Sequence, residues 1–107
     1  MKKKFEIKFN GLKLIVSDYD ICASFFSKVR GLMFRINPKP LLFIWKRPVR
    51  ISIHSFFVFQ KFVAVWYYRG KIIKIKLVKP WTFAVTPKVK FNKLLEIPVH
   101  SSAIRNI

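Results

Sequence analysis

The sequence predicts a mainly β domain of the β-rich α+β class, a compact barrel-like sheet of about 6–8 short strands with one short helix near residues 24–33. Three observations support this prediction. Apolar and polar residues alternate in several short runs, turn-forming residues separate these runs, and β-branched and aromatic residues dominate the chain after Pro40. The length of 107 residues fits one domain, so we take residues 1–107 as a single unit.

The first predicted element is a β-hairpin. Between Lys3 and Phe9, apolar and polar residues alternate strictly, which predicts a half-buried strand. Asn10-Gly11 follows, the pair most favoured in a two-residue type I′ turn. Leu12–Val16 is then expected to return as the second strand.

A short helix is expected after an extended piece at Ile21–Ala23. Ser24 can accept a hydrogen bond from a free backbone N–H in the first turn of that helix. An apolar stripe at helical spacing follows, formed by Phe25, Phe26, Val29, Leu32 and Met33. Prolines at 38 and 40 end this region, because proline disfavours helix at the residue before it.

The rest of the chain is predicted to be β structure. Strands are expected over Leu41–Trp45, Val49–Phe59, Phe62–Tyr68, Ile73–Leu77, Phe83–Val85 and Leu94–Ile97. Arg69-Gly70-Lys71 is the expected turn between the third and fourth of these strands.

The charge is strongly unbalanced. The chain has 22 Lys and Arg residues against 4 acids, a formal net charge of +18. The acids are Glu6, Asp18, Asp20 and Glu96. Such a field attracts polyanions, whether nucleic acid or an anionic membrane surface. The alternative is that the charge reflects a generally basic proteome.

Residues for catalysis or metal binding are sparse. Asp18 and Asp20 are close in sequence in an expected loop, where solvated acids are favoured over a catalytic carboxylate pair, and Glu96 is the only acid after residue 20. Cys22, His54 and His100 lack the spacing of zinc ligands. A Cys22–His54 nucleophile pair is the less favoured alternative to a buried apolar cysteine. We therefore expect no catalytic residues, no metal and no cofactor, and a protein that is not an enzyme.

The expected location is the cytoplasm. The basic start at residues 1–4 is followed by Glu6, Lys8 and Lys13, where a signal peptide would be apolar. Every window of about 18 residues contains charge, so no transmembrane helix is predicted. Oligomeric state is not predictable from these features.

A basic and aromatic combination predicts a candidate nucleic-acid surface. Its cations are Arg47, Arg50, Arg69, Lys71, Lys74 and Lys76, which lie near the rings of Trp45, Trp66, Tyr67 and Tyr68. Sheets that bind single strands combine stacking rings with cations in this way. The favoured alternative is that the rings fill a core and the lysines mark a solvated face.

Residues 23–35, ASFFSKVRGLMFR, resemble the signature of the family known as domain of unknown function 192, including its Gly-Leu-Met-x-Arg motif at Gly31–Arg35. Four further pieces in matching order strengthen the resemblance: Leu41–Phe43, Ser52–Val58, Lys79–Trp81 and Leu94–Pro98. The resemblance implies a compact barrel-like β domain with a short helix and no established activity. This chain is similar to the archaeal members, which look cytoplasmic.

Two departures from the family pattern concern possible site positions. Val63 stands where relatives usually carry Asp, and His100 stands where they usually carry Gly. Loss of the Asp alters a site if the Asp served one, and affects only local stability if it capped a turn.

Within the resemblance, Arg30 and Arg35 are the side chains best suited to bind an anion or backbone carbonyls. Glu96 is the only acid late in the chain, so a Glu96–Arg35 pair is the preferred structural hypothesis. The sequence therefore predicts a non-enzymatic binding or structural module. Its anion or ligand site would be formed by Arg30, Arg35, His54 and Glu96. The alternative is a nucleic-acid-binding protein that uses the basic strands.

Overall fold

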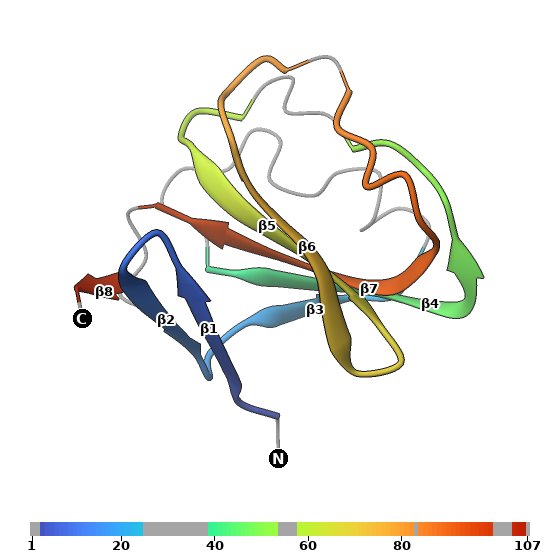
Figure 1. Cartoon of the computed structure of the whole chain (residues 1–107), viewed down its shortest axis with the longest axis horizontal. Coiled ribbons are helices and arrows are strands. Elements are labelled where there is room, and N and C mark those ends of the chain that lie inside the picture. Colours follow the sequence, from blue (N-terminus) through green and yellow to red (C-terminus); the bar gives the residue numbers. More distant parts are fainter. Residues whose placement is uncertain (1–2, 25–38, 54–57, 83, 100–103, 107) are drawn as a thin grey trace.

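The computed structural model describes residues 3–24, 39–53, 58–82, 84–99 and 104–106 (Figure 1). These residues form eight strands: β1 (Phe5–Phe9), β2 (Leu12–Val16), β3 (Asp20–Cys22), β4 (Leu41–Val49), β5 (Phe62–Tyr68), β6 (Lys71–Val78), β7 (Phe91–Pro98) and β8 (Ile104–Asn106). The strands form a three-stranded sheet of order β1-β2-β8 and a five-stranded sheet of order β3-β4-β7-β5-β6.

The predicted mainly β class is confirmed, and the strand number falls within the predicted range. The predicted helix near residues 24–33 lies outside the described residues, apart from Ser24. Closure into a barrel stays a prediction, because β3 and β6 form the two edges of the five-stranded sheet within the described part of the chain.

The first hairpin has the predicted turn. Phe5 pairs with Val16 and Phe9 with Leu12, so two residues connect β1 to β2. Asn10 and Gly11 both have positive φ angles, 51° and 76°, as a type I′ turn requires. The two residues that connect β5 to β6, Arg69 and Gly70, also both have positive φ angles, 52° and 78°.

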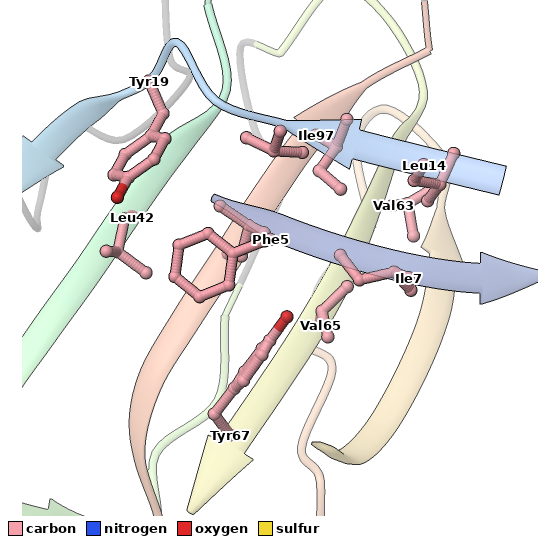
Figure 2. Close-up of a cluster of buried hydrophobic side chains, with 11 residues drawn as sticks. Phe5, Ile7, Leu14, Tyr19, Leu42, Val63, Val65, Tyr67 and Ile97 are labelled. Carbon is pink, nitrogen blue, oxygen red and sulfur yellow. The ribbon is translucent and has the colours of Figure 1, made fainter. Parts of the chain in front are cut away.

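β5 is covered on both faces, because residues 62–67 are all buried. On one face, the β1–β2 hairpin packs over the five-stranded sheet and forms the hairpin-side core (Figure 2). This core consists of Phe5, Ile7, Leu14, Val16, Tyr19, Leu42, Val63, Val65, Tyr67, Leu95 and Ile97. The Phe5 ring meets the Tyr19 and Tyr67 rings edge-on, each at 5.5 Å between centroids.

The opposite face of the sheet carries a second group of buried side chains, the far-side core. It consists of Cys22, Leu41, Phe43, Val58, Phe62, Ala64, Trp66, Val78, Val85, Phe91 and Leu94. Alternate residues of β5 thus enter opposite cores, which explains why its sequence is continuously apolar. Val63 lies within β5 in the hairpin-side core, so this position is not a turn cap in this chain.

Two strand predictions are wrong in the described residues. β4 runs on to Val49, and the described residues of the predicted strand Val49–Phe59 that follow Val49 make one isolated bridge, between Ile53 and Val85. Pro48 lacks an N–H, and the β4–β7 register shifts between Ile44 and Val49, so the ladder ends irregularly there. Val85 is likewise in an isolated bridge and not in the predicted strand Phe83–Val85, whose Phe83 lies outside the described residues.

Candidate anion-binding surface

Glu96 is a buried acid in the middle of the five-stranded sheet. It pairs with Leu41 of β4 on one side and with Ala64 of β5 on the other. Directly paired residues share a sheet face, so the Glu96 side chain projects toward the far-side core with Leu41 and Ala64. Only 5% of the residue is exposed.

This position makes a charged Glu96 unfavourable. Burial raises the pKa of the Glu96 carboxyl from 4.5 to about 8, because the apolar surroundings disfavour the charged form. The acid is therefore mostly neutral at pH 7 and can donate a hydrogen bond as well as accept one. Burial also raises the pKa of the Tyr67 phenol, to about 12, which keeps that group neutral.

A second buried polar group lies on the same face as Glu96. Trp66 pairs with Leu94, two residues along β7 from Glu96, and is fully buried. Its indole Nε1 has no hydrogen-bond partner among the described residues. Buried polar groups are rarely left without partners, so this face is the place where further polar contacts are expected.

The other residues of the predicted anion site cannot be placed beside Glu96. Arg30, Arg35 and His54 all lie outside the described residues. Cys22 of the proposed Cys22–His54 alternative is buried in the far-side core. Within the described ranges, no three His, Cys, Asp or Glu side chains come together as metal ligands would.

Exposed cations gather at one end of the five-stranded sheet, which we call the basic end. It comprises Lys46, Arg47, Arg50, Arg69, Lys71 and Lys90, all exposed. The strand order explains the gathering. β7 lies between β4 and β5, so the end of β4, the start of β7 and the β5–β6 turn share one side of the molecule (Figure 1).

Among the described residues, no acid side chain forms an ion pair with the basic end. All four acids of the chain are among the described residues. Glu6 lies 3.8 Å from Lys4, and Asp18 lies 3.4 Å from Lys39, measured between charged atoms. Asp20 begins β3 at the opposite end of β4, and Glu96 is buried. In the described part of the chain, no ion pair with an acid side chain therefore offsets the positive charge of the basic end.

The sequence-predicted cations divide into two groups. Arg47, Arg50, Arg69 and Lys71 belong to the basic end, whereas Lys74 and Lys76 lie farther along the edge strand β6. Lys74 also has a structural role. Its Nζ donates to the Thr86 carbonyl at 3.3 Å and lies 5.9 Å from the centre of the buried Trp66 ring.

Two of the four predicted stacking rings are inaccessible. Trp66 and Tyr67 are buried in opposite cores, so the favoured core interpretation applies to both. Trp45 is partly buried and meets Phe91 edge-on, with 5.3 Å between ring centres. Tyr68 is partly exposed, and the Arg69 guanidinium lies 5.2 Å from its ring centre. Tyr68 is thus a ring of the basic end that a ligand can reach.

Sequence reasoning missed Lys46 and Lys90. Both are exposed at the basic end, but each belongs to a different stretch of sequence. Lys46 adjoins the predicted Arg47 and was detectable by that adjacency. Lys90 reaches this end only because it precedes β7, the strand inserted between β4 and β5.

Two solved structures are similar to this fold. A protein of unknown function from Novosphingobium aromaticivorans has a TM-score of 0.71 at 12% identity, over 89% of this chain and 71% of that chain. A Sinorhizobium meliloti protein described as a "putative transcription regulator" has a TM-score of 0.69 at 14% identity, over 87% and 80%. At such identities the likeness establishes the fold alone. No protein-family model and no curated protein matches the sequence.

Among the described residues, no helix is long and apolar enough to cross a bilayer.

Proposed function

We propose that this chain is a non-enzymatic binding module that captures a polyanion at its basic end. The observation that carries this proposal is the gathering of six exposed cations from three separate segments, with all four acids elsewhere. Scattered surface lysines would be expected on any basic protein. Convergence at one acid-free end concentrates the field where a chain of phosphates can meet several cations together.

The same surface supports a second candidate function, nucleic-acid binding. Tyr68 offers a partly exposed ring beside Arg69 and its strand partner Lys71, and stacking next to cations suits single strands. The similar fold of the Sinorhizobium meliloti protein, itself described as a "putative transcription regulator", is compatible with this function. Arg47 and Arg50 extend the cationic surface onto the adjacent irregular end of β4.

The predicted site of Arg30, Arg35, His54 and Glu96 stays part of this proposal as a separate site. A neutral Glu96 is compatible with an anion there, because a carboxylic acid can donate a hydrogen bond whereas a carboxylate repels. Membership of the domain of unknown function 192 family, with a barrel-like fold, a helix over residues 24–33 and a cytoplasmic location, is proposed on the order of the five motifs.

The test is a fluorescence titration with single-stranded and duplex oligonucleotides and with inorganic polyphosphate, at about 50 and about 200 mM salt. Six phosphate contacts on duplex DNA predict that the logarithm of the association constant falls with the logarithm of the salt concentration with a slope of about −5. The variant Lys71→Gln/Lys90→Gln should bind about tenfold more weakly and reduce the slope by about 2. Binding of oligonucleotides in preference to polyphosphate would favour the second candidate.

The matched control is Lys8→Gln/Lys13→Gln on the β1–β2 hairpin. It removes the same charge from two lysines that face each other away from the basic end. We expect its affinity to stay within about twofold of the parent, because distant charges are screened in salt. Equal losses in both variants would show that net charge alone drives binding. Absence of binding to all three probes at the lower salt concentration would refute the proposal.

A further inference from the structure

The end of the sheet opposite the basic end has a different character. Phe62 of β5 pairs with Val78 of β6, and the segments leading into β5 and out of β6 emerge together there (Figure 1). Phe59 is three residues before this pair and Trp81 is three residues after it. They are 56% and 54% exposed. We call this surface the tip and define it as Phe59, Lys61, Lys79, Trp81 and Val99.

Trp81 is presented by a strained turn. In Lys79-Pro80-Trp81-Thr82 the Thr82 hydroxyl donates to the Lys79 carbonyl at 2.7 Å, and Trp81 has a φ of 62°. Proline followed by a positive φ is the pattern of a type II turn, whose third residue is normally Gly or Asn. A bulky aromatic there costs free energy. The chain thus places a half-exposed indole at a turn position whose backbone conformation favours glycine.

The neighbours of the two rings make the tip amphipathic. Val99 donates its N–H to the Lys61 carbonyl at 3.0 Å, so the C-terminal end of β7 lies directly beside the segment that enters β5. Val99 is itself exposed. Lys61 and Lys79 are exposed beside these apolar groups.

This combination fits one kind of partner best. A single-stranded nucleic acid stacks its bases on flat rings and places its phosphates near cations. The exposed aliphatic side chain of Val99 would have no role in such a complex. The interface of an anionic bilayer accepts aromatic and aliphatic side chains together and attracts flanking lysines. No acid side chain belongs to the tip. Asp20 begins β3, which is the opposite edge of the sheet from β6, and Glu6 and Asp18 are paired with Lys4 and Lys39.

We infer that the tip is a peripheral binding site for anionic lipid surfaces, in which Trp81 and Phe59 enter the headgroup region and Lys61 and Lys79 contact lipid phosphates. This inference is independent of the function proposed for the basic end. The two surfaces lie at opposite ends of β5, about 20 Å apart at the rise of a strand. The protein can therefore hold a polyanion at one end while the other touches a membrane.

The test is cosedimentation of the full chain with phosphatidylcholine vesicles that contain or lack phosphatidylserine. We expect binding only with phosphatidylserine, a blue shift of tryptophan emission, and quenching by brominated lipid. Trp81→Gly removes the indole and suits the positive φ, and its melting temperature is recorded together with its vesicle binding. Trp81→Gly and Phe59→Ser should each weaken vesicle binding about tenfold, because each removes a large apolar side chain from the interface.

The matched control is Ile21→Ser, which removes an equally exposed apolar side chain from the edge strand β3. It should bind vesicles like the parent. The inference is overturned if Trp81→Gly and Phe59→Ser sediment with vesicles like the parent, or if the parent fails to bind phosphatidylserine vesicles. It is also overturned if only Lys71→Gln/Lys90→Gln loses vesicle binding, because the basic end would then be the contact. Binding of every variant is measured at a temperature at which its melting curve shows the folded state, so a loss of binding is not a loss of fold.

Discussion

Replacement of Glu96 by Gln tests how the far-side core accommodates an acid. The Glu96 carboxyl has a pKa of about 8 in the folded chain, against an ordinary value of 4.5. Between these values the unfolded chain releases the proton and the folded chain keeps it, so the free energy of unfolding falls as pH rises. One pKa unit corresponds to about 1.4 kcal/mol. The acid therefore lowers the stability at pH 7 by about 3 kcal/mol relative to pH below 4.5.

The measurement is urea unfolding of the parent and of Glu96→Gln at several values between pH 5 and 8, followed by tryptophan fluorescence. Other titrating groups are common to both proteins and cancel in the difference. The stability of Glu96→Gln relative to the parent should rise by about 3 kcal/mol across this range and level off above pH 8. The amide is nearly isosteric, so packing with Leu41 and Ala64 is retained.

Two outcomes would refute this reasoning. A difference that does not change with pH would show that Glu96 does not titrate in this range. A variant that is less stable than the parent at neutral pH, by an amount that shrinks as pH falls into the acidic range, would show a charged and paired carboxylate. The Glu96–Arg35 hypothesis predicts that second outcome, so the experiment decides between a neutral acid and an ion pair.

Three further predictions concern stability. Leu14→Ala should lower the free energy of unfolding by about 2–5 kcal/mol in urea melts, because Leu14 is fully buried in the hairpin-side core. Gly11→Ala should cost about 1 kcal/mol from its positive φ alone, since the added Cβ meets no atom within 4 Å, and Gly11→Asn should cost less. Lys74→Met should destabilise by about 1 kcal/mol through loss of its contacts with Thr86 and Trp66, yet bind oligonucleotides like the parent; a large loss of binding without destabilisation would contradict this structural role.

The local features of the fold were predictable from the sequence. The strands Leu12–Val16 and Phe62–Tyr68 have the predicted bounds. Their runs of apolar residues reflect the burial of each strand, so the sequence shows where each begins and ends. The Asn10-Gly11 turn was predictable because both residues tolerate positive φ. The extension of β4 beyond Trp45 was not, because it depends on pairing with β7, which lies far away in the sequence.

The candidate surfaces were only partly predictable. Sequence proximity identified Arg69 and Lys71, which adjoin one turn. It could not identify Lys90, whose place at the basic end depends on strand order. Glu96 was singled out as the one late acid, but the apolar neighbours that raise its pKa come from β4 and β5 and appear only in the folded sheet.

The insertion of β7 between β4 and β5 has a consequence during synthesis on the ribosome. β4 and β5 do not pair with each other in the described sheet; each pairs with β7, which is made later than both. Until residues 91–98 emerge, the nascent chain holds a β3–β4 pair and a β5–β6 hairpin with two apolar edges open to other chains. Growing chains of this protein are thus most exposed to aggregation, and most in need of chaperones, in the interval before β7 closes the gap.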